Sequence, residues 1–240
     1  VKKGFGLGVG IHDFNNDGLI DIYAGNDFIT NDLLYMNTLS NEGENIFNEK
    51  AATYLKHQTF NAMGLDLADL NQDDIPEIMV LDMLPEDYKR QKEMLGSMNY
   101  DKYELAINND YTPQFMHNTL QVSQGRNPNG DLVYSEQGFM LNVAKTDWSW
   151  APLFADFDLD GDLDLYVTNG YGKDITNLDF INYSNQNNVF GTEETRYEEL
   201  RRLVGKLEPV KLKNYYFESK GGTLFEKSDA FYSEESLSNG

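Results

Sequence analysis

A short acidic turn with strand-like flanks occurs three times in this chain, and this repetition limits the possible folds more than any other feature. The clearest copy reads DFDLDGDLDL, from Asp156 to Leu165, and holds five aspartates in ten residues. Two carboxylates about 4 Å apart repel each other by roughly 4 kcal/mol at an effective dielectric constant near 20. Something must therefore hold such a turn closed.

Three longer segments share one plan around these turns. They read GLGVGIHDFNNDGLIDIYAGND from Gly6, AMGLDLADLNQDDIPEIMVLDM from Ala62, and SWAPLFADFDLDGDLDLYVTNG from Ser149. In each, a small or apolar run precedes the acidic turn, and a second run rich in β-forming residues follows it. Two more strand-like runs complete each unit, at 32–38 and 45–51, at 117–125 and 132–139, and at 214–221 and 223–231. The Gly-rich run at 4–10 is interpreted as a close-packed inner strand.

A unit of four antiparallel strands is typical of a propeller blade, so the sequence predicts an all-β chain, a β-propeller with partly helical insertions. We expect about three blades: 5–52, then 60–140 with an insertion at 85–115, then 149–232 with an insertion at 173–211. Three blades are fewer than the four to eight of a closed ring, which indicates a propeller fragment.

Both insertions follow the second strand of their unit and should therefore emerge on the same face. A helix is predicted in the second insertion, capped by Thr192 and stopped by Pro209. Its apolar residues fall on one face; they are Tyr197, Leu200, Leu203, Val204 and Leu207.

The acidic turns present oxygen ligands at alternate positions, which suits a hard cation. Positions 1, 3, 5, 7 and 9 are Asp13, Asn15, Asp17, Leu19 and Asp21 in the first turn, Asp69, Asn71, Asp73, Ile75 and Glu77 in the second, and Asp156, Asp158, Asp160, Asp162 and Asp164 in the third. Position 7 would contribute its backbone carbonyl. A set of five to seven oxygen donors suits Ca²⁺, so we expect two or three calcium ions as the cofactor.

The second turn is the weakest of the three candidate sites. Gly18 and Gly161 occupy position 6, where the chain reverses sharply, but the second turn has Asp74 there. An EF-hand or dockerin loop is excluded, because its acidic ligand at position 12 is replaced by Ala24, Val80 and Val167. The alternative is an acidic turn held by side-chain to backbone hydrogen bonds without a metal.

The turns DFNNDGLIDI and DFDLDGDLDL resemble the calcium turns of FG-GAP (VCBS) repeats, which form the blades of integrin α-subunit propellers. With YAGNDF, LDMLPEDYKRQ and LDFINY, the chain resembles bacterial FG-GAP-like proteins related to the cartilage acidic protein group, which often carry an ASPIC/UnbV domain. This resemblance implies a calcium-bound propeller in an exported protein: secreted, periplasmic or at the cell surface.

The net charge of -21 excludes nucleic acid as an expected partner, because phosphate contacts need a surplus of Lys and Arg. The negative charge also disfavours binding to anionic membrane surfaces. The sequence contains no apolar run of 18 residues, so no insertion into a membrane is predicted. The chain has no cysteine, which excludes disulfides and thiolate metal sites.

The sequence favours a non-enzymatic module of the adhesion type, which binds a protein or glycan ligand. No nucleophile elbow, P-loop or zinc-protease motif occurs, and the three histidines are scattered. We interpret His12 as a partly buried strand residue beside the first turn, and Trp148 and Trp150 as packing between blades rather than a sugar platform. The alternative is a calcium-dependent propeller hydrolase acting on phosphate esters or polysaccharide. The position of the basic residues in the insertions disfavours it; they are Lys89, Arg90, Lys92, Arg196, Arg201 and Arg202.

Overall fold

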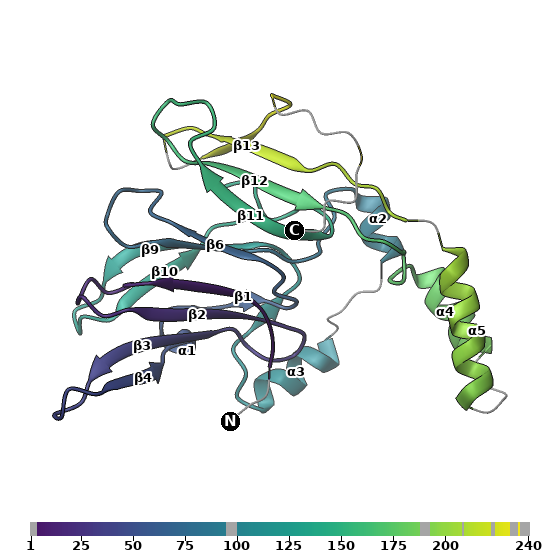
Figure 1. Cartoon of the computed structure of the whole chain (residues 1–240), viewed down its shortest axis with the longest axis horizontal. Helices are drawn as coiled ribbons and strands as arrows, with labels where there is room; N and C mark the ends of the chain where they lie inside the picture. Colours follow the sequence, from purple (N-terminus) through teal and green to yellow (C-terminus); the bar gives the residue numbers. More distant parts are fainter. Residues whose placement is uncertain are drawn as a thin grey trace.

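The computed structural model contains three stacked four-stranded antiparallel sheets (Figure 1). It describes residues 4–94, 100–187, 193–207, 209–221, 224–230 and 235, without the side chains of 183–196 and 199. The first contains β1 (Phe5–His12), β2 (Asp21–Asp27), β3 (Leu33–Leu39) and β4 (Asn45–Glu49). The second contains β6 (Leu65–Ala68), β7 (Glu77–Val80), β9 (Thr119–Arg126) and β10 (Leu132–Glu136). The third contains β11 (Ser149–Ala155), β12 (Asp164–Asn169), β13 (Tyr215–Ser219) and β14 (Phe225–Lys227).

The three sheets repeat one topology and one register. In each sheet the strands follow one another in space as they do in sequence. The second strand pairs with the third at equivalent positions, which are Ala24 with Leu33, Val80 with Thr119, and Val167 with Tyr215. The predicted antiparallel units of four strands are therefore confirmed. No closed ring forms among the described strands, so the propeller stays a prediction.

The first strands of the sheets approach one another closely. β6 lies between β1 and β11. A Cβ atom on Gly10 would come within 2.7 Å of the Leu67 side chain, and one on Gly64 within 2.1 Å of the Trp150 carbonyl oxygen. The absence of side chains at these glycines lets the sheets stack. The Gly-rich run is therefore closely packed on the side that faces β6, at Gly8 and Gly10, whereas its other side is exposed.

The middle sheet is buried on both of its faces. On β7, Ile78 and Val80 belong to the apolar cluster shared with the first sheet, whereas Met79 belongs to the cluster shared with the third. Alternation of side chains along a strand produces this division. The first sheet is covered on one side only, and its exposed apolar residues on β1 are Phe5, Leu7, Val9 and Ile11.

The helices lie mainly in the two insertions. α2 (Tyr88–Glu93), α3 (Tyr100–Asn108) and β8 (Gln114–Phe115) separate β7 from β9, whereas α4 (Leu178–Asn187) and α5 (Glu193–Lys206) separate β12 from β13. Both insertions emerge at the same end of the stacked sheets, as predicted (Figure 1), and a β-bridge between Met94 and Asn177 joins them. Every helix of the described chain is too short or too polar to span a membrane.

Some local predictions need adjustment. The strand expected over 45–51 ends at Glu49, whose carboxylate accepts the backbone N–H of Ala51 at 2.6 Å, and α1 (Ala51–Tyr54) follows. The strands expected over 132–139 and 223–231 are shorter, at Leu132–Glu136 and Phe225–Lys227. The helix expected from Thr192 is present as α5, although Thr192 itself lies outside the described residues. On its apolar face Leu203 is buried, but Tyr197 and Leu200 are exposed.

Candidate metal centre

The three acidic turns connect the first and second strands of each sheet, so they lie at the end opposite to the insertions. Positions 4 and 6 of every turn have positive φ; the residues are Asn16 and Gly18, Gln72 and Asp74, and Leu159 and Gly161. Glycine adopts this backbone without a steric penalty, whereas Asp74 adopts it at φ 64° with a Cβ atom present. The strain predicted for the second turn is therefore present in its backbone.

The first carboxylate of each turn accepts two backbone N–H groups from the reversal. Asp13 accepts those of Asp17 at 3.1 Å and Gly18 at 2.7 Å. The same pair of bonds recurs at Asp69 and at Asp156, with lengths of 3.0–3.1 Å. The oxygen at position 3 shares the N–H of position 5 with the first carboxylate, and the carboxylate at position 5 accepts the N–H of position 7. These bonds orient the side-chain oxygens and offset part of their mutual repulsion.

The carboxylate at position 9 joins each turn to the third strand of its sheet. Asp21 accepts the N–H of Phe14 at 3.0 Å and that of Asn37 on β3 at 2.7 Å. Equivalent bonds join Glu77 to Leu70 and Ser123, and Asp164 to Phe157 and Ser219. All three of these carboxylate residues are buried. Position 9 therefore ties each turn to the third strand of its sheet.

Burial of the carboxylate at position 9 changes its pKa, most clearly at Glu77. Burial raises the pKa of Glu77 to about 7, backbone N–H groups oppose that rise, and repulsion from Asp73 and Asp69 adds to it. Burial likewise raises the pKa of Asp21. A cation beside these carboxylates would favour their ionised form and lower both pKa values.

The third turn has the densest set of carboxylates. One oxygen each of Asp156, Asp158 and Asp160 lies within 4.8 Å of the other two. The first two turns have Asn15 and Asn71 in place of Asp158, and all three sets consist of oxygen donors, which suits Ca²⁺ rather than zinc or copper. The Asp162 side chain accepts the N–H of Gly221 at 2.9 Å, so its carboxylate is engaged with the loop that follows β13. The backbone carbonyls of Leu19, Ile75 and Asp162 stay predicted donors.

The two tryptophans and Arg90 pack within the protein. The Trp148 ring stacks on Tyr171 with centroids 4.2 Å apart, and Trp150 donates its indole N–H to the Gly170 carbonyl. Arg90 of the first insertion forms an ion pair with Asp147 and donates to the Tyr171 hydroxyl at 2.7 Å. These contacts anchor α2 against the third sheet.

The structure places the histidines differently from the prediction. His12 is the last residue of β1, as expected, but it is exposed rather than partly buried, with its Nδ1 atom 3.1 Å from the Asp13 carbonyl oxygen. His57 and His117 are not scattered, because the fold brings them together beside Glu136. No spacing motif in the sequence indicates this contact, since it depends on where β5 (Gln58–Thr59) and β8 pair.

Comparison with known families supports the repeat. Residues 13–80 match the model of the FG-GAP-like repeat. The matched segment begins at the first residue of the first acidic turn and ends with β7, so it contains the first two turns. No curated protein matched the chain.

Proposed function

We propose that the chain is a calcium-stabilised FG-GAP-type repeat module that binds a protein or glycan ligand outside the cytoplasm and catalyses no reaction. The observation that carries the proposal is the repetition of one hydrogen-bonded acidic turn in three sheets, two of them within a segment that matches the FG-GAP-like repeat. A relation to the ASPIC/UnbV-associated group, and export from the cytoplasm, are parts of the same proposal.

Calcium would neutralise the carboxylates and join the first strand of each sheet to the second. The donors would be the residues at positions 1, 3, 5, 7 and 9 of each turn, with Leu19, Ile75 and Asp162 acting through their carbonyls. Two or three ions are proposed, with the second turn the weakest site because Asp74 is strained and Glu77 at position 9 has a longer side chain than the Asp of the other two turns. The hydrogen bonds at position 9 hold the frame in which the ion would bind.

The exposed apolar face of β1 supports a propeller with further blades. Phe5, Leu7, Val9 and Ile11 alternate along the strand on the side away from β6, and all four are exposed. The equivalent side of β6 is covered by the neighbouring sheet. Another four-stranded unit packed on β1 would cover these residues in the same manner.

The insertion end of the sheets is the proposed ligand-binding face, because loops on a rigid scaffold commonly carry recognition. An apolar pocket of about 440 Å³ lies there between α3 and the β2–β3 loop, with Phe28, Ile29 and Leu105 in its lining. Phe28 and Ile29 have φ values of 60° and 71°. A β-branched residue rarely adopts this backbone, and such strain often marks a binding surface.

The proposal is tested by thermal unfolding and calcium titration. Removing calcium with EDTA should lower the melting temperature strongly, and added Ca²⁺ should restore it. Asp158→Ala should weaken one site in isothermal titration and leave the others unchanged. Asp162→Asn is the matched control, because it removes a carboxylate from the same turn but keeps the carbonyl.

The binding role needs its own assay. Protein and glycan arrays probed in calcium should give a saturable signal with no turnover of the ligand. Hydrolysis of phosphate esters or polysaccharides by the purified chain would contradict the non-enzymatic role, and an unchanged melting curve in EDTA would contradict the role of calcium.

A further inference from the structure

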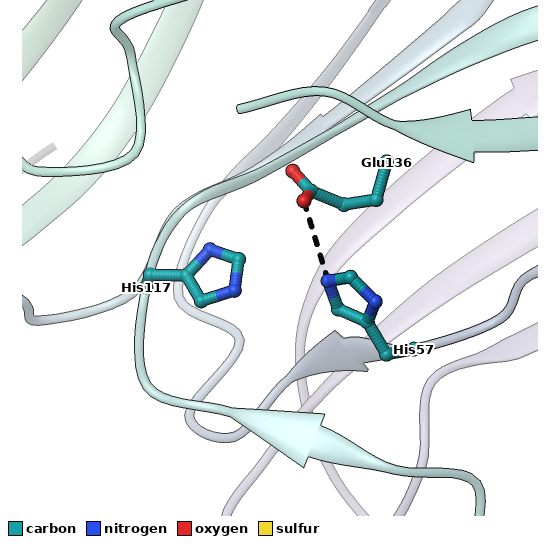
Figure 2. Close-up of side chains that lie close together, drawn as sticks. All are labelled: His57, His117 and Glu136. Atoms are coloured by element: carbon teal, nitrogen blue, oxygen red, sulfur yellow. Dashed lines mark ion pairs between the residues drawn. The ribbon is translucent and has the colours of Figure 1, made fainter. Parts of the chain in front are cut away.

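Two histidines and a glutamate meet at one end of the second sheet (Figure 2). His57 lies between α1 and β5, His117 between β8 and β9, and Glu136 is the last residue of β10. One potential ligand atom of each residue lies within 4.8 Å of the other two. Their proximity results from the fold, because 60 residues separate the two histidines.

The Glu136 carboxylate is oriented by the backbone. Its Oε1 atom accepts the N–H of Gly138 at 2.6 Å and that of Leu120 at 3.2 Å. Its Oε2 atom is directed toward His57, with 3.3 Å between Oε2 and Nε2 (Figure 2). One oxygen therefore fixes the side chain and the other faces the imidazoles.

The His117 ring is held in the tautomer that a metal requires. This histidine is buried, and its Nδ1 atom lies 2.7 Å from the carbonyl oxygen of Asn118. Because a carbonyl can only accept a hydrogen bond, Nδ1 carries the proton and Nε2 keeps its lone pair. A ring nitrogen that donates to a carbonyl while the other stays free is the usual arrangement of metal-binding histidines.

His57 contributes a nitrogen that lies 3.3 Å from the Glu136 carboxylate but forms no well-aligned hydrogen bond with it. This atom, Nε2, is buried. Leaving a buried polar atom unsatisfied costs about 1–3 kcal/mol. An ion placed between the two imidazoles and the carboxylate would satisfy this atom.

We propose that His57, His117 and Glu136 bind one divalent transition-metal ion such as Zn²⁺. Two imidazole nitrogens and one carboxylate suit zinc or ferrous iron and disfavour Ca²⁺ and Mg²⁺, which prefer oxygen. The His57 side chain remains 25% exposed, which gives an ion and its water molecules a way in. Three protein ligands leave at least one coordination position for water or another small ligand. This site is independent of the acidic turns and of their calcium.

The experiment titrates the whole chain with Zn²⁺ alone in a calorimeter, in buffer with millimolar Ca²⁺ to occupy the acidic turns. We expect one zinc site per chain. His57→Gln and His117→Gln should each weaken it roughly 100-fold or more, because ligand loss exceeds the 10–100-fold effect of losing a supporting group. His12→Gln is the matched control, since it removes the one other histidine and should leave zinc affinity unchanged.

Two results would overturn the site: no zinc binding by the native chain, or equal zinc affinity in the native chain and both ligand variants. Circular dichroism of each variant without zinc establishes that it is folded. If the buried His117 cannot be replaced, the partly exposed His57→Gln variant decides the question. Visible absorption of the Co²⁺-substituted chain gives a second readout, because loss of an imidazole ligand changes the spectrum.

Discussion

Asp32→Asn should stabilise the protein at high pH. Asp32 precedes β3 and is fully buried; its carboxylate accepts the Tyr23 hydroxyl at 2.6 Å and the N–H of Asn26 at 2.8 Å. Burial raises the pKa of Asp32 to about 7 against these two bonds. The equivalent residues of the other sheets are Asn118 and Asn214, which accept the corresponding N–H of Asp82 and Asn169 at 2.8 Å. The chain itself therefore shows that an amide fits this position.

The size of the effect follows from proton linkage. An unfolded aspartate has a pKa of about 3.9, so between pH 4 and pH 7 the folded state retains a proton that the unfolded state has lost. Stability therefore falls as the pH rises through this window. About three pKa units at 1.36 kcal/mol each give roughly 4 kcal/mol in total. Between pH 5 and pH 8 the native chain should lose roughly 2.5 kcal/mol through this group, and Asp32→Asn should lose none of it.

Urea unfolding of the native and variant chains at pH 5 and pH 8, both with saturating Ca²⁺, measures this difference. The amide that Asp32→Asn introduces can still accept from Asn26 and can donate to the Tyr23 oxygen, so the bonds remain. Asp82→Asn is the control: that carboxylate also has its pKa raised to about 7, but it accepts the N–H groups of Phe60, Asn61 and Met83. A single amide oxygen cannot accept all three of these N–H groups, so Asp82→Asn should be destabilising at pH 5. A pH-independent difference between Asp32→Asn and the native chain would refute the reasoning.

Three further predictions concern packing and charge. Gly64→Ala should lower the free energy of unfolding by about 3 kcal/mol or more, because its Cβ would meet the Trp150 carbonyl. Gly18→Ala, with open space around the Cβ but φ 85°, should lower it by about 1 kcal/mol. Urea unfolding would measure both variants, and equal losses would contradict the close approach at Gly64. Arg90→Met should cost about 3–5 kcal/mol, because it leaves Asp147 buried without its partner. Lys89→Met, which removes an exposed i,i+4 pair with Glu93, should cost less than about 0.5 kcal/mol, and thermal unfolding of both variants would test the contrast.

The strands and turns could be predicted from the sequence because their signals are local. Apolar alternation and the spacing of Asp13, Asp69 and Asp156 define the repeated unit without knowledge of the rest of the fold. The ends of β4 and β10 could not be predicted in the same way. Glu49 and Glu136 end these strands, and each carboxylate accepts the backbone N–H two residues further on and another N–H from the third strand of its sheet. The second bond depends on how the strands pair rather than on the local sequence.

The candidate site divides along the same line. The oxygen donors of each turn lie within nine residues, so their positions could be predicted from the sequence. The burial of the carboxylate at position 9 could not. Asp21, Glu77 and Asp164 acquire their second N–H donor from a strand that follows later in the chain. The meeting of His57 with His117 and the pairing of Arg90 with Asp147 likewise depend on tertiary packing. Contacts of this kind leave no periodic trace in the sequence.

We propose that Ca²⁺ occupies the acidic turns. Native mass spectrometry of the purified chain, after equilibration in micromolar Ca²⁺, counts bound ions directly. We predict two or three calcium ions per chain, with one fewer in the Asp156→Ala variant. A chain that carries no calcium under these conditions, while its circular dichroism spectrum is that of a folded β protein, would contradict the claim.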